Sequence, residues 1–516
     1  MIGNIFLEKR KVANSRKLTS PQSLNSYIKG ICDIMRRSGR AGALQYVPEL
    51  TWMLFLRILD VNEEREQERA NALGVEFTPS LKYPYRWRDW ASPDGKKRKE
   101  LQEGAFGAFM PFVNGELISY LRNLENKPGA TSRQKIISEI FSPIEKTGID
   151  TERNLLDILD KINELSLADI DETHMFTLSQ VYEGLLLKMG EKNNDGGQFF
   201  TPREVIRVMA QVINPQIGET VYDPCCGTGG FLAQAYMHMR EKAKTADDIE
   251  TLKTRTFYGR EKENLIYPIA LANLVLHEID ESHIWHGNTL TGLEVYGGLF
   301  QEAPGLFDVV LTNPPFGGKE GKDAQTRFAY KTSSTQVLFL QHVIDSLKPG
   351  GRCGIVMDEG VLFRTNENAF VQTKRKLLNE CNLFCIVSLP PKVFLNAGAA
   401  SKTNLLFFVK GEPTREIWYY DLSDFNVTKK QPFTLQHFDD FFKLFNPSTL
   451  KLSESEHSWS VPIEEIEKKN FDIKAVNPNR KDEGDKRTPE ELLGIIELQT
   501  KEIQNTLITL RNKNLL

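Results

Sequence analysis

The sequence predicts an α/β fold in which a largely parallel, doubly wound sheet follows an all-helical N-terminal domain and precedes a helical C-terminal extension. From Thr220 onward, short apolar runs rich in β-branched and aromatic residues alternate with helical stretches, which is the pattern of βαβ units. From Pro21 to about Leu187, apolar residues recur at helical spacing instead. After Asp421 the sequence is mixed and polar until Thr488, where a stretch with one apolar stripe indicates a long amphipathic helix.

Seven runs are predicted to be strands, and because they are apolar throughout we expect helices on both faces of their sheet. They are ETVYDP, RTFYGRE, HIWHGNTL, FDVVLTNPP, RCGIVMDEG, NLFCIVSLP and TNLLFFVKG. In the helical region, the apolar side chains of one long stretch can share a helix face: Trp52, Leu54, Phe55, Ile58 and Leu59.

A chain of 516 residues predicts two or three domains. We divide it into a basic tail (1–20), a helical N-terminal domain (21–190), a catalytic domain (191–425) and a C-terminal extension (426–516). The polar, glycine-containing segment EKNNDGG marks the boundary between the helical and the catalytic domains.

The composition indicates a folded protein of the cytoplasm. Hydrophobic residues make up 40% and charged residues 26% of the chain, and no apolar run approaches the roughly 18 to 20 residues of a membrane span. The basic N-terminus has no apolar signal core after it. The six cysteines form no paired CxxC framework, so we expect reduced thiols and no metal site. A net charge of −4 indicates that a partner supplies much of any affinity for nucleic acid.

A glycine-rich turn, VYDPCCGTGGFL, follows the first predicted strand and leads into a helix near Phe231. Glycines at Gly227, Gly229 and Gly230 let the backbone turn sharply and approach a ligand at the carboxyl edge of the sheet. The turn therefore indicates a nucleotide-like cofactor, although many α/β proteins need such a turn only to pack a helix on a strand.

Two polar residues follow the next two strands. Glu261 ends the second strand, where a carboxylate can accept hydrogen bonds from both hydroxyls of a ribose. Its alternative role is that of an acidic residue at a helix N-terminus. Asn288 follows the third strand and could bond an adenine amino group, or it could form an ordinary Asn turn.

The fourth strand ends in Asn313, Pro314, Pro315 and Phe316, and two successive prolines force a rigid corner there. The Asn313 side-chain oxygen and the Pro314 carbonyl could accept hydrogens from an amino nitrogen while it attacks a methyl sulfonium in line. Phe316 offers a face on which a flipped-out base can stack. The alternative is a simple strand-ending turn with Phe316 in the core.

The order GQFFTP, DPCCGTGG, GRE, NPPF resembles the gamma class of amino-methyltransferases, and specifically the modification subunits of type I restriction-modification systems. Further resemblance lies in LKPGGRCGIVMDEGVLF, in CIVSLPPKVFLNAGAASKTNLLFFVKG, in NFDIKAVNPN and in the helical region around FLRILDVNEERE. The resemblance implies a Rossmann-like class I S-adenosylmethionine methyltransferase domain that methylates adenine N6 in DNA.

The resemblance also implies roles for individual residues. The contacts to S-adenosylmethionine would come from Gln198, Phe199, Phe200, Thr201, Pro202, Arg203, Asp223, Gly227, Thr228, Gly229, Gly230 and Glu261. The target adenine would be held by Asn313, Pro314 and Phe316 in the rigid corner. Asn288 departs from the family, in which aspartate is more frequent at this position. Independently, Thr201, Pro202 and Glu204 have the pattern of a helix capping box with proline at the first helical position.

The implied partners are DNA, a second copy of this chain, one specificity subunit and a restriction translocase subunit. The helix from Pro489, with a capping box of Thr488 and Glu491, is our candidate for docking on the specificity subunit. The basic stretch after the corner, which contains Lys319, Lys322, Arg327 and Lys331, is predicted to be a mobile loop that closes over DNA phosphates.

Three other functions compete with this interpretation. A C5-cytosine methyltransferase needs a Pro-Cys nucleophile, and Pro224 and Cys225 lie inside the glycine turn, away from the catalytic corner. RNA adenine or protein glutamine methyltransferases use a similar corner on the same fold. A non-catalytic scaffold would not need every catalytic position intact. The sequence contains no groove-reading motif that would identify a DNA site.

Overall fold

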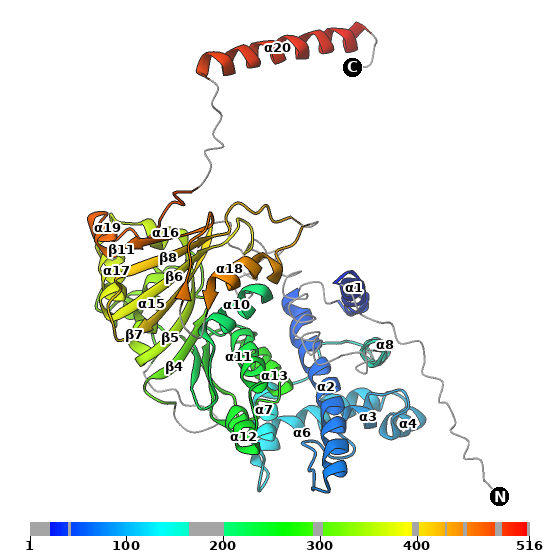
Figure 1. The fold of residues 1–516 in the computed structure, drawn as a ribbon. Helices are drawn as coiled ribbons and strands as arrows, with labels where there is room; N and C mark the ends of the chain where they lie inside the picture. Colours follow the sequence, from blue (N-terminus) through cyan, green and yellow to red (C-terminus); the bar gives the residue numbers. More distant parts are fainter. Residues whose placement is uncertain are drawn as a thin grey trace, which may run out of the picture. The chain divides into compact units, whose positions relative to one another are not determined.

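The structure is a computed structural model that describes residues 21–39, 43–164, 201–292, 303–394, 402–428, 431–446, 451–479 and 488–512. The chain divides into two units, Met1–Val476 and Asn477–Leu516. Figure 1 shows a helical part, coloured blue and cyan, and a sheet whose strands run from green to orange. Among the described helices, none is long and apolar enough to cross a membrane.

The described part of the N-terminal domain, up to residue 164, is helical as predicted. Its main helices are α1 (Pro21–Arg37), α2 (Ala43–Leu73), α3 (Trp87–Trp90), α4 (Lys96–Glu103), α5 (Phe109–Pro111), α6 (Ile118–Arg122), α7 (Ser132–Phe141) and α8 (Glu152–Asn163), with a π-helical turn, η1 (Phe112–Leu117), before α6. The five apolar residues expected to share a face of α2 are all buried, and Met53 and Leu56 are buried as well, so this part of the helix is buried on all sides. Helix α2 crosses the centre of the domain, where Trp52 lies 6.4 Å from Trp90 and 6.2 Å from Phe141 between ring centroids.

All seven predicted strands are present in a nine-stranded sheet with the order β11-β8-β6-β7-β5-β4-β1-β2-β3. The strands are β1 (Val221–Asp223), β2 (Phe257–Glu261), β3 (His283–His286), β4 (Phe307–Thr312), β5 (Leu347–Asp358), β6 (Cys381–Ser388), β7 (Thr403–Lys410), β8 (Glu416–Asp421) and β11 (Ser458–Pro462). The sheet is largely parallel, but β7 runs antiparallel to both β5 and β6, and β11 runs antiparallel to β8. Strand β11 lies beyond residue 425, so the C-terminal extension contributes an edge strand to the catalytic sheet.

Helices cover both faces of the sheet, which explains the uniformly apolar strands. Along β4, Val309 and Leu311 belong to the same core as α10 (Arg203–Ile213), α11 (Gly230–Arg240) and α13 (Tyr267–Leu276). Phe307 and Val310 belong to the opposite core, which includes residues of α15 (Thr335–Ser346) and α17 (Asn368–Glu380). The sheet is therefore the middle layer of three.

The helical domain packs on α13 through α2 and α7. An ion-pair cluster accompanies this contact: the Arg133 guanidinium of α7 lies 2.9 Å from Glu66 and 3.4 Å from Glu63 of α2, and 2.8 Å from Asp280 after α13. These four side chains are mostly buried, so removing one partner would leave a buried charge unpaired, which costs more than breaking a surface ion pair.

The second unit contains α20 (Pro489–Asn512). The predicted capping box is confirmed, since the Thr488 backbone N–H donates to the Glu491 carboxylate at 2.7 Å and the Glu491 N–H donates to the Thr488 hydroxyl at 3.2 Å. The apolar side chains of α20 are exposed within the described chain: Leu493, Ile495, Ile496, Leu498, Ile503, Leu507 and Ile508.

Candidate functional site

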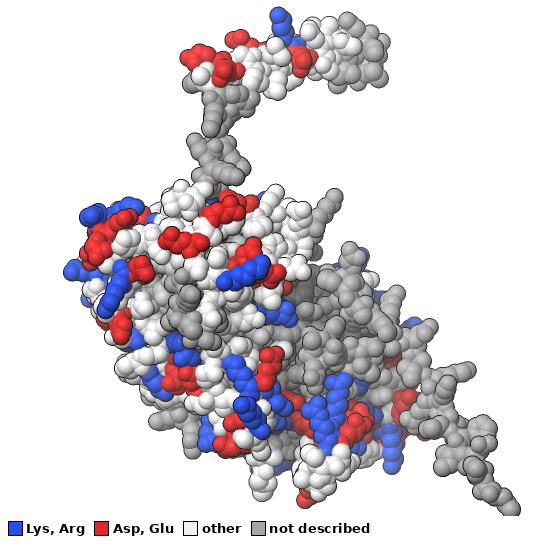
Figure 2. Space-filling view, viewed as in Figure 1, with Lys and Arg blue, Asp and Glu red and all other residues white. Residues whose placement is uncertain are grey.

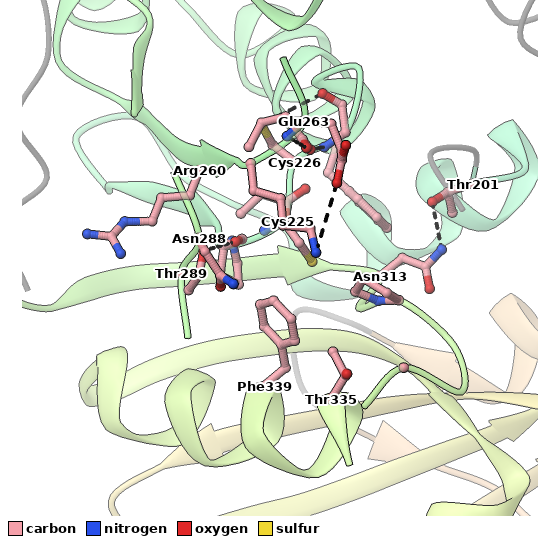
Figure 3. A pocket seen from close by; sticks show the side chains of 18 of the residues that line it. Thr201, Cys225, Cys226, Arg260, Glu263, Asn288, Thr289, Asn313, Thr335 and Phe339 are labelled. Carbon is pink, nitrogen blue, oxygen red and sulfur yellow. Dashed lines mark hydrogen bonds and ion pairs between the residues drawn. The ribbon is translucent and has the colours of Figure 1, made fainter. Parts of the chain in front are cut away.

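A cavity opens at the carboxyl ends of β1, β2 and β4, where the chain order of the strands reverses from β1-β2 to β1-β4. Ligands of open α/β sheets bind at such a switch point. The cavity is lined by Thr201, Ile206, 223–228, Gly230, Phe231, 260–263, 287–289, Asn313, Pro315, 318–320, Thr335 and Phe339. Figure 3 shows the side chains of Asn288, Asn313 and Phe339 on different sides of it.

The glycine turn forms one wall and has the expected backbone. Gly227 and Gly229 have φ angles of 55° and 78°, in the left-handed region that favours glycine. Gly230 lies close to α10, because an added Cβ would be 3.2 Å from the Ile206 side chain, which would have to shift slightly. The turn thus serves both of the purposes considered from the sequence: it bends sharply beside the cavity, and it lets α11 pack closely.

Glu261 reaches the turn from the end of β2. Its carboxylate accepts hydrogen bonds from the backbone N–H groups of Gly227 at 3.0 Å and Glu263 at 2.8 Å. Burial nevertheless raises the pKa of the Glu261 carboxyl to about 7. The alternative role at a helix N-terminus does not fit, because α13 begins only at Tyr267.

Asp223 ties β1 to β4. Its Oδ1 atom accepts the Thr312 hydroxyl at 2.7 Å and the Cys225 backbone N–H at 3.2 Å. The Cys225 Sγ also lies 3.1 Å from the Thr312 hydroxyl. Burial raises the pKa of Asp223 to about 7. The sequence analysis missed Thr312, although a polar residue at the end of an apolar strand was a visible signal.

The Asn313 side chain is held at one end only. Its Nδ2 donates to the Thr201 hydroxyl at 3.0 Å, whereas its Oδ1 is buried and has no hydrogen-bond partner among the described residues. In Figure 3 this oxygen points away from Thr201. The neighbouring Pro314 carbonyl accepts a long hydrogen bond, 3.4 Å, from the Gln336 amide of α15.

The predicted capping box at Thr201 is wrong. Helix α10 begins at Arg203, one residue later than expected, and its N-cap Pro202 has an extended ψ of 135° and no side-chain cap. The Thr201 hydroxyl bonds Asn313 instead. Arg203 is buried, and neither Pro202 nor Arg203 lines the cavity. Gln198, Phe199 and Phe200 lie outside the described residues.

Phe316 is partly buried, and its ring meets Phe394 edge to face with centroids 5.5 Å apart. Neither Phe316 nor Pro314 lines the cavity, whereas Asn313 and Pro315 do. The corner therefore lies between the cavity and this aromatic pair. The sequence analysis did not single out Phe394.

The third strand supplies Asn288, whose Oδ1 accepts the Leu290 backbone N–H at 2.9 Å. The Asn turn considered from the sequence is therefore present, and Asn288 lines the cavity as well. Two further lining residues were missed. Arg260 is buried and stacks on Trp285 at 4.0 Å from the ring centroid, and Phe339 enters from α15.

The loop after the corner makes several contacts within the protein, while its predicted closure over DNA phosphates stays a prediction. Lys319 forms an antiparallel bridge with Ser334, and the Arg327 guanidinium donates to the carbonyl oxygens of Thr289 at 3.2 Å and Leu290 at 2.9 Å. Arg327 is exposed, but its guanidinium is hydrogen-bonded to the backbone of this chain. Lys319, Lys322 and Lys331 are exposed as well.

Comparison with known proteins gives consistent results over nearly the whole chain. Residues 173–486 match the N-6 DNA Methylase family, and residues 24–162 match the HsdM N-terminal domain. The methylase subunit of the type I restriction enzyme EcoEI of Escherichia coli is 34% identical, covering 93% of this chain and 95% of that protein. The EcoKI methylase subunit of Escherichia coli K12 is 30% identical, covering 85% of this chain and 79% of that protein.

Solved structures agree. A chain from a structural study of complex assembly in the type I restriction-modification system has a TM-score of 0.67 and 37% identity, with 95% of this chain and 98% of that chain covered. A modification subunit assigned to a type I restriction enzyme of Vibrio vulnificus YJ016 has a TM-score of 0.76 and 32% identity, with 90% and 98% covered.

Proposed function

Because this chain belongs to the methylase subunits of type I restriction enzymes and is an N6-adenine DNA methyltransferase, we propose that S-adenosylmethionine binds in the cavity at the ends of β1, β2 and β4. When bound, this cofactor supplies an electrophilic methyl group. The residues that line the cavity fit S-adenosylmethionine. The glycine turn offers a close backbone approach, and the Glu261 carboxylate offers acceptors for ribose hydroxyls beside it.

The observation that carries the proposed mechanism is the buried Asn313 Oδ1, which lacks a partner among the described residues. Leaving such an atom unpaired is costly unless a ligand completes it. We propose that Asn313 Oδ1 accepts a hydrogen bond from one hydrogen of the adenine amino group. The Pro314 carbonyl accepts a hydrogen bond from the other hydrogen. Both acceptors would offset the positive charge that develops on the nitrogen during transfer. Phe316, packed on the buried Phe394, supplies the apolar face against which the flipped base rests.

The test is Asn313→Ala in the assembled methyltransferase with its specificity subunit. The methylation rate should fall by a factor on the order of a hundred or more, as it does when a transition-state hydrogen bond is lost. Calorimetry of the same variant should give an unchanged affinity for S-adenosylmethionine, because Asn313 acts on the amino group. Unchanged turnover would remove the mechanism, and absence of cofactor binding by the wild-type chain would remove the proposed site.

The assembly that we propose for this chain is based on its net charge and on the exposed apolar side chains of α20. With a net charge of −4 the chain presents too few unbalanced cations for tight DNA binding by itself. We propose that a specificity subunit reads the DNA site, that two copies of this chain and a restriction translocase join it, and that α20 docks on the specificity subunit. We place this complex in the cytoplasm, where the six free cysteines stay reduced.

A C5-cytosine mechanism through Cys225 has no support in the geometry. Burial raises the pKa of the Cys225 thiol well above its usual value, so this cysteine is not an activated nucleophile. This residue lines the cavity, but its sulfur lies 3.1 Å from the hydroxyl of Thr312, directly before the corner.

A further inference from the structure

Among the described residues, the Thr201 hydroxyl is the one hydrogen-bond partner of the Asn313 side chain, and it comes from a segment 112 residues earlier in the chain. Thr201 immediately precedes α10, where a threonine would ordinarily cap the helix. Here α10 begins after Pro202 without a side-chain cap, so the hydroxyl is not used by the helix. Its position serves Asn313 instead.

The two ends of an asparagine amide are chemically opposite, since the nitrogen can only donate and the oxygen can only accept. An amino group that is to be methylated needs acceptors for its hydrogens, so only the Asn313 Oδ1 end can serve it. That end is free only while Nδ2 has an acceptor of its own. Thr201 Oγ1 is that acceptor, at 3.0 Å.

We propose that Thr201 is a positioning residue, whose hydroxyl pairs the buried Nδ2 of Asn313 and thereby keeps Oδ1 available to the target amino group. A hydroxyl could also donate to a reversed amide, so Thr201 does not choose the orientation alone. The target amino group favours the orientation in which Oδ1 points toward it, because it needs an acceptor. In that orientation Thr201 accepts from the Asn313 NH2 group and so removes the cost of leaving this buried donor unpaired. This inference rests on the proposed function.

The backbone of the corner is held separately, which makes the role of Thr201 testable. Thr312, directly before Asn313, is fully buried and bonds Asp223 and Cys225. Removing the Thr201 hydroxyl therefore leaves these ties between β1 and β4 intact. We expect the side chain of Asn313, and not the path of the backbone, to be affected.

The experiment compares Thr201→Val, which removes the hydroxyl at nearly constant volume, with Thr201→Ser, which keeps it. In the assembled methyltransferase, Thr201→Val should lower kcat by about ten- to a hundredfold, corresponding to the cost of an unpaired buried donor. KM for DNA and the calorimetric affinity for S-adenosylmethionine should each change less than about threefold, because the bond serves the transition state. Thr201→Ser should restore kcat to within about threefold of wild type.

Thr256→Val is the matched control, because Thr256 is a buried threonine at the opposite end of β2 whose hydroxyl bonds the Thr251 carbonyl. It removes the same group from the same kind of environment and should leave kcat unchanged. Thermal melting of all variants shows whether a loss of rate is only a loss of folded protein.

A double-mutant cycle with Asn313→Ala separates positioning from general structural damage. If Thr201 acts through the Asn313 amide, Thr201→Val should lower the single-turnover rate of Asn313→Ala by less than about twofold, since neighbouring residues that act as a unit are not additive. An undiminished effect in that background would overturn the proposal.

Two other results would also overturn it. Wild-type kcat in Thr201→Val would show that the bond is dispensable, and a loss of cofactor affinity of about tenfold or more with unchanged kcat would make Thr201 a cofactor ligand only. Either result contradicts the role of Thr201 but not the proposed function. The proposed function itself would be contradicted by a wild-type chain that neither binds S-adenosylmethionine nor methylates adenine.

Discussion

At the scale of single residues, the site brings two buried carboxyls together at the ends of neighbouring strands. Burial raises the pKa values of Asp223 and Glu261 to about 7, although both accept backbone hydrogen bonds that favour the charged form. Asp223 is committed to Thr312, within the protein. Glu261 lies against the glycine turn at the cavity wall. The two carboxyls therefore have different roles despite similar surroundings.

The raised pKa of Glu261 predicts opposite pH effects on binding and on stability. Affinity for S-adenosylmethionine should rise as the pH passes through about 7, because the charged carboxylate is the better acceptor for ribose hydroxyls. The stability that Glu261 contributes is fully present below the unfolded-state pKa near 4.5. It is lost as the pH rises through about 7, since the folded chain binds that proton more tightly.

Calorimetry from pH 6 to 8 on wild type and Glu261→Gln provides the check. The variant should keep only the pH dependence that belongs to Asp223. Glu261→Ala should weaken binding by about 1.5 to 3 kcal/mol, the range for hydrogen bonds to a charged group. An identical pH profile in wild type and Glu261→Gln would exclude a cofactor role for this carboxylate.

At the scale of elements, the strands and helices that follow from the periodicity of apolar residues were predicted from the sequence. The features that depend on tertiary contacts were not. Each of the seven strand runs became a strand, because strands buried on both faces need uniformly apolar residues. Strand β8, which pairs with β6 and β11, was not predicted, although its aromatic run EIWYYD was a visible signal; β11, at the sheet edge, was not predicted because it lies in the stretch interpreted as mixed and polar. The capping box predicted at Thr201 was wrong because the Thr201 hydroxyl bonds Asn313 and does not cap α10. This contact is between residues far apart in the chain, so a local sequence pattern could not reveal it.

The loop after the corner gives a prediction at this scale. Arg327 ties it to the carbonyls of Thr289 and Leu290, so chymotrypsin should cut slowly at Phe328 and Tyr330 even without DNA. Arg327→Ala should speed this cleavage severalfold, whereas Lys331→Ala, at an exposed lysine of the same loop, should not. Equal cleavage rates in wild type and both variants would show that the two hydrogen bonds do not control the opening of the loop.

At the scale of the whole molecule, the second unit is small and its helix has an exposed apolar stripe. Within the described residues of its own unit, helix α20 has no partner for this stripe, and a monomer gains little from exposing it. A helix with such a stripe suits packing on helices of another subunit.

Deleting residues from Pro489 onward should therefore abolish assembly with the specificity subunit while leaving the affinity for S-adenosylmethionine unchanged. Analytical ultracentrifugation of the mixed subunits measures the first effect and calorimetry the second. Replacing Thr500, which is exposed on the same helix and bonds only the Ile496 carbonyl, with alanine is the matched control. Full assembly after the deletion would place the docking surface elsewhere on the chain.

The ion-pair cluster of Arg133 has a consequence for how such subunits can be recombined. Glu63 and Glu66 belong to the helical domain, Asp280 belongs to the catalytic domain, and Arg133 forms ion pairs with all three at their junction. A chimera that takes its helical domain from one relative and its catalytic domain from another inherits only part of this charge balance. Unless both parents carry matching residues, the hybrid buries an unpaired charge. Such a hybrid should therefore be less stable than either parent unless the residues at this junction are exchanged together.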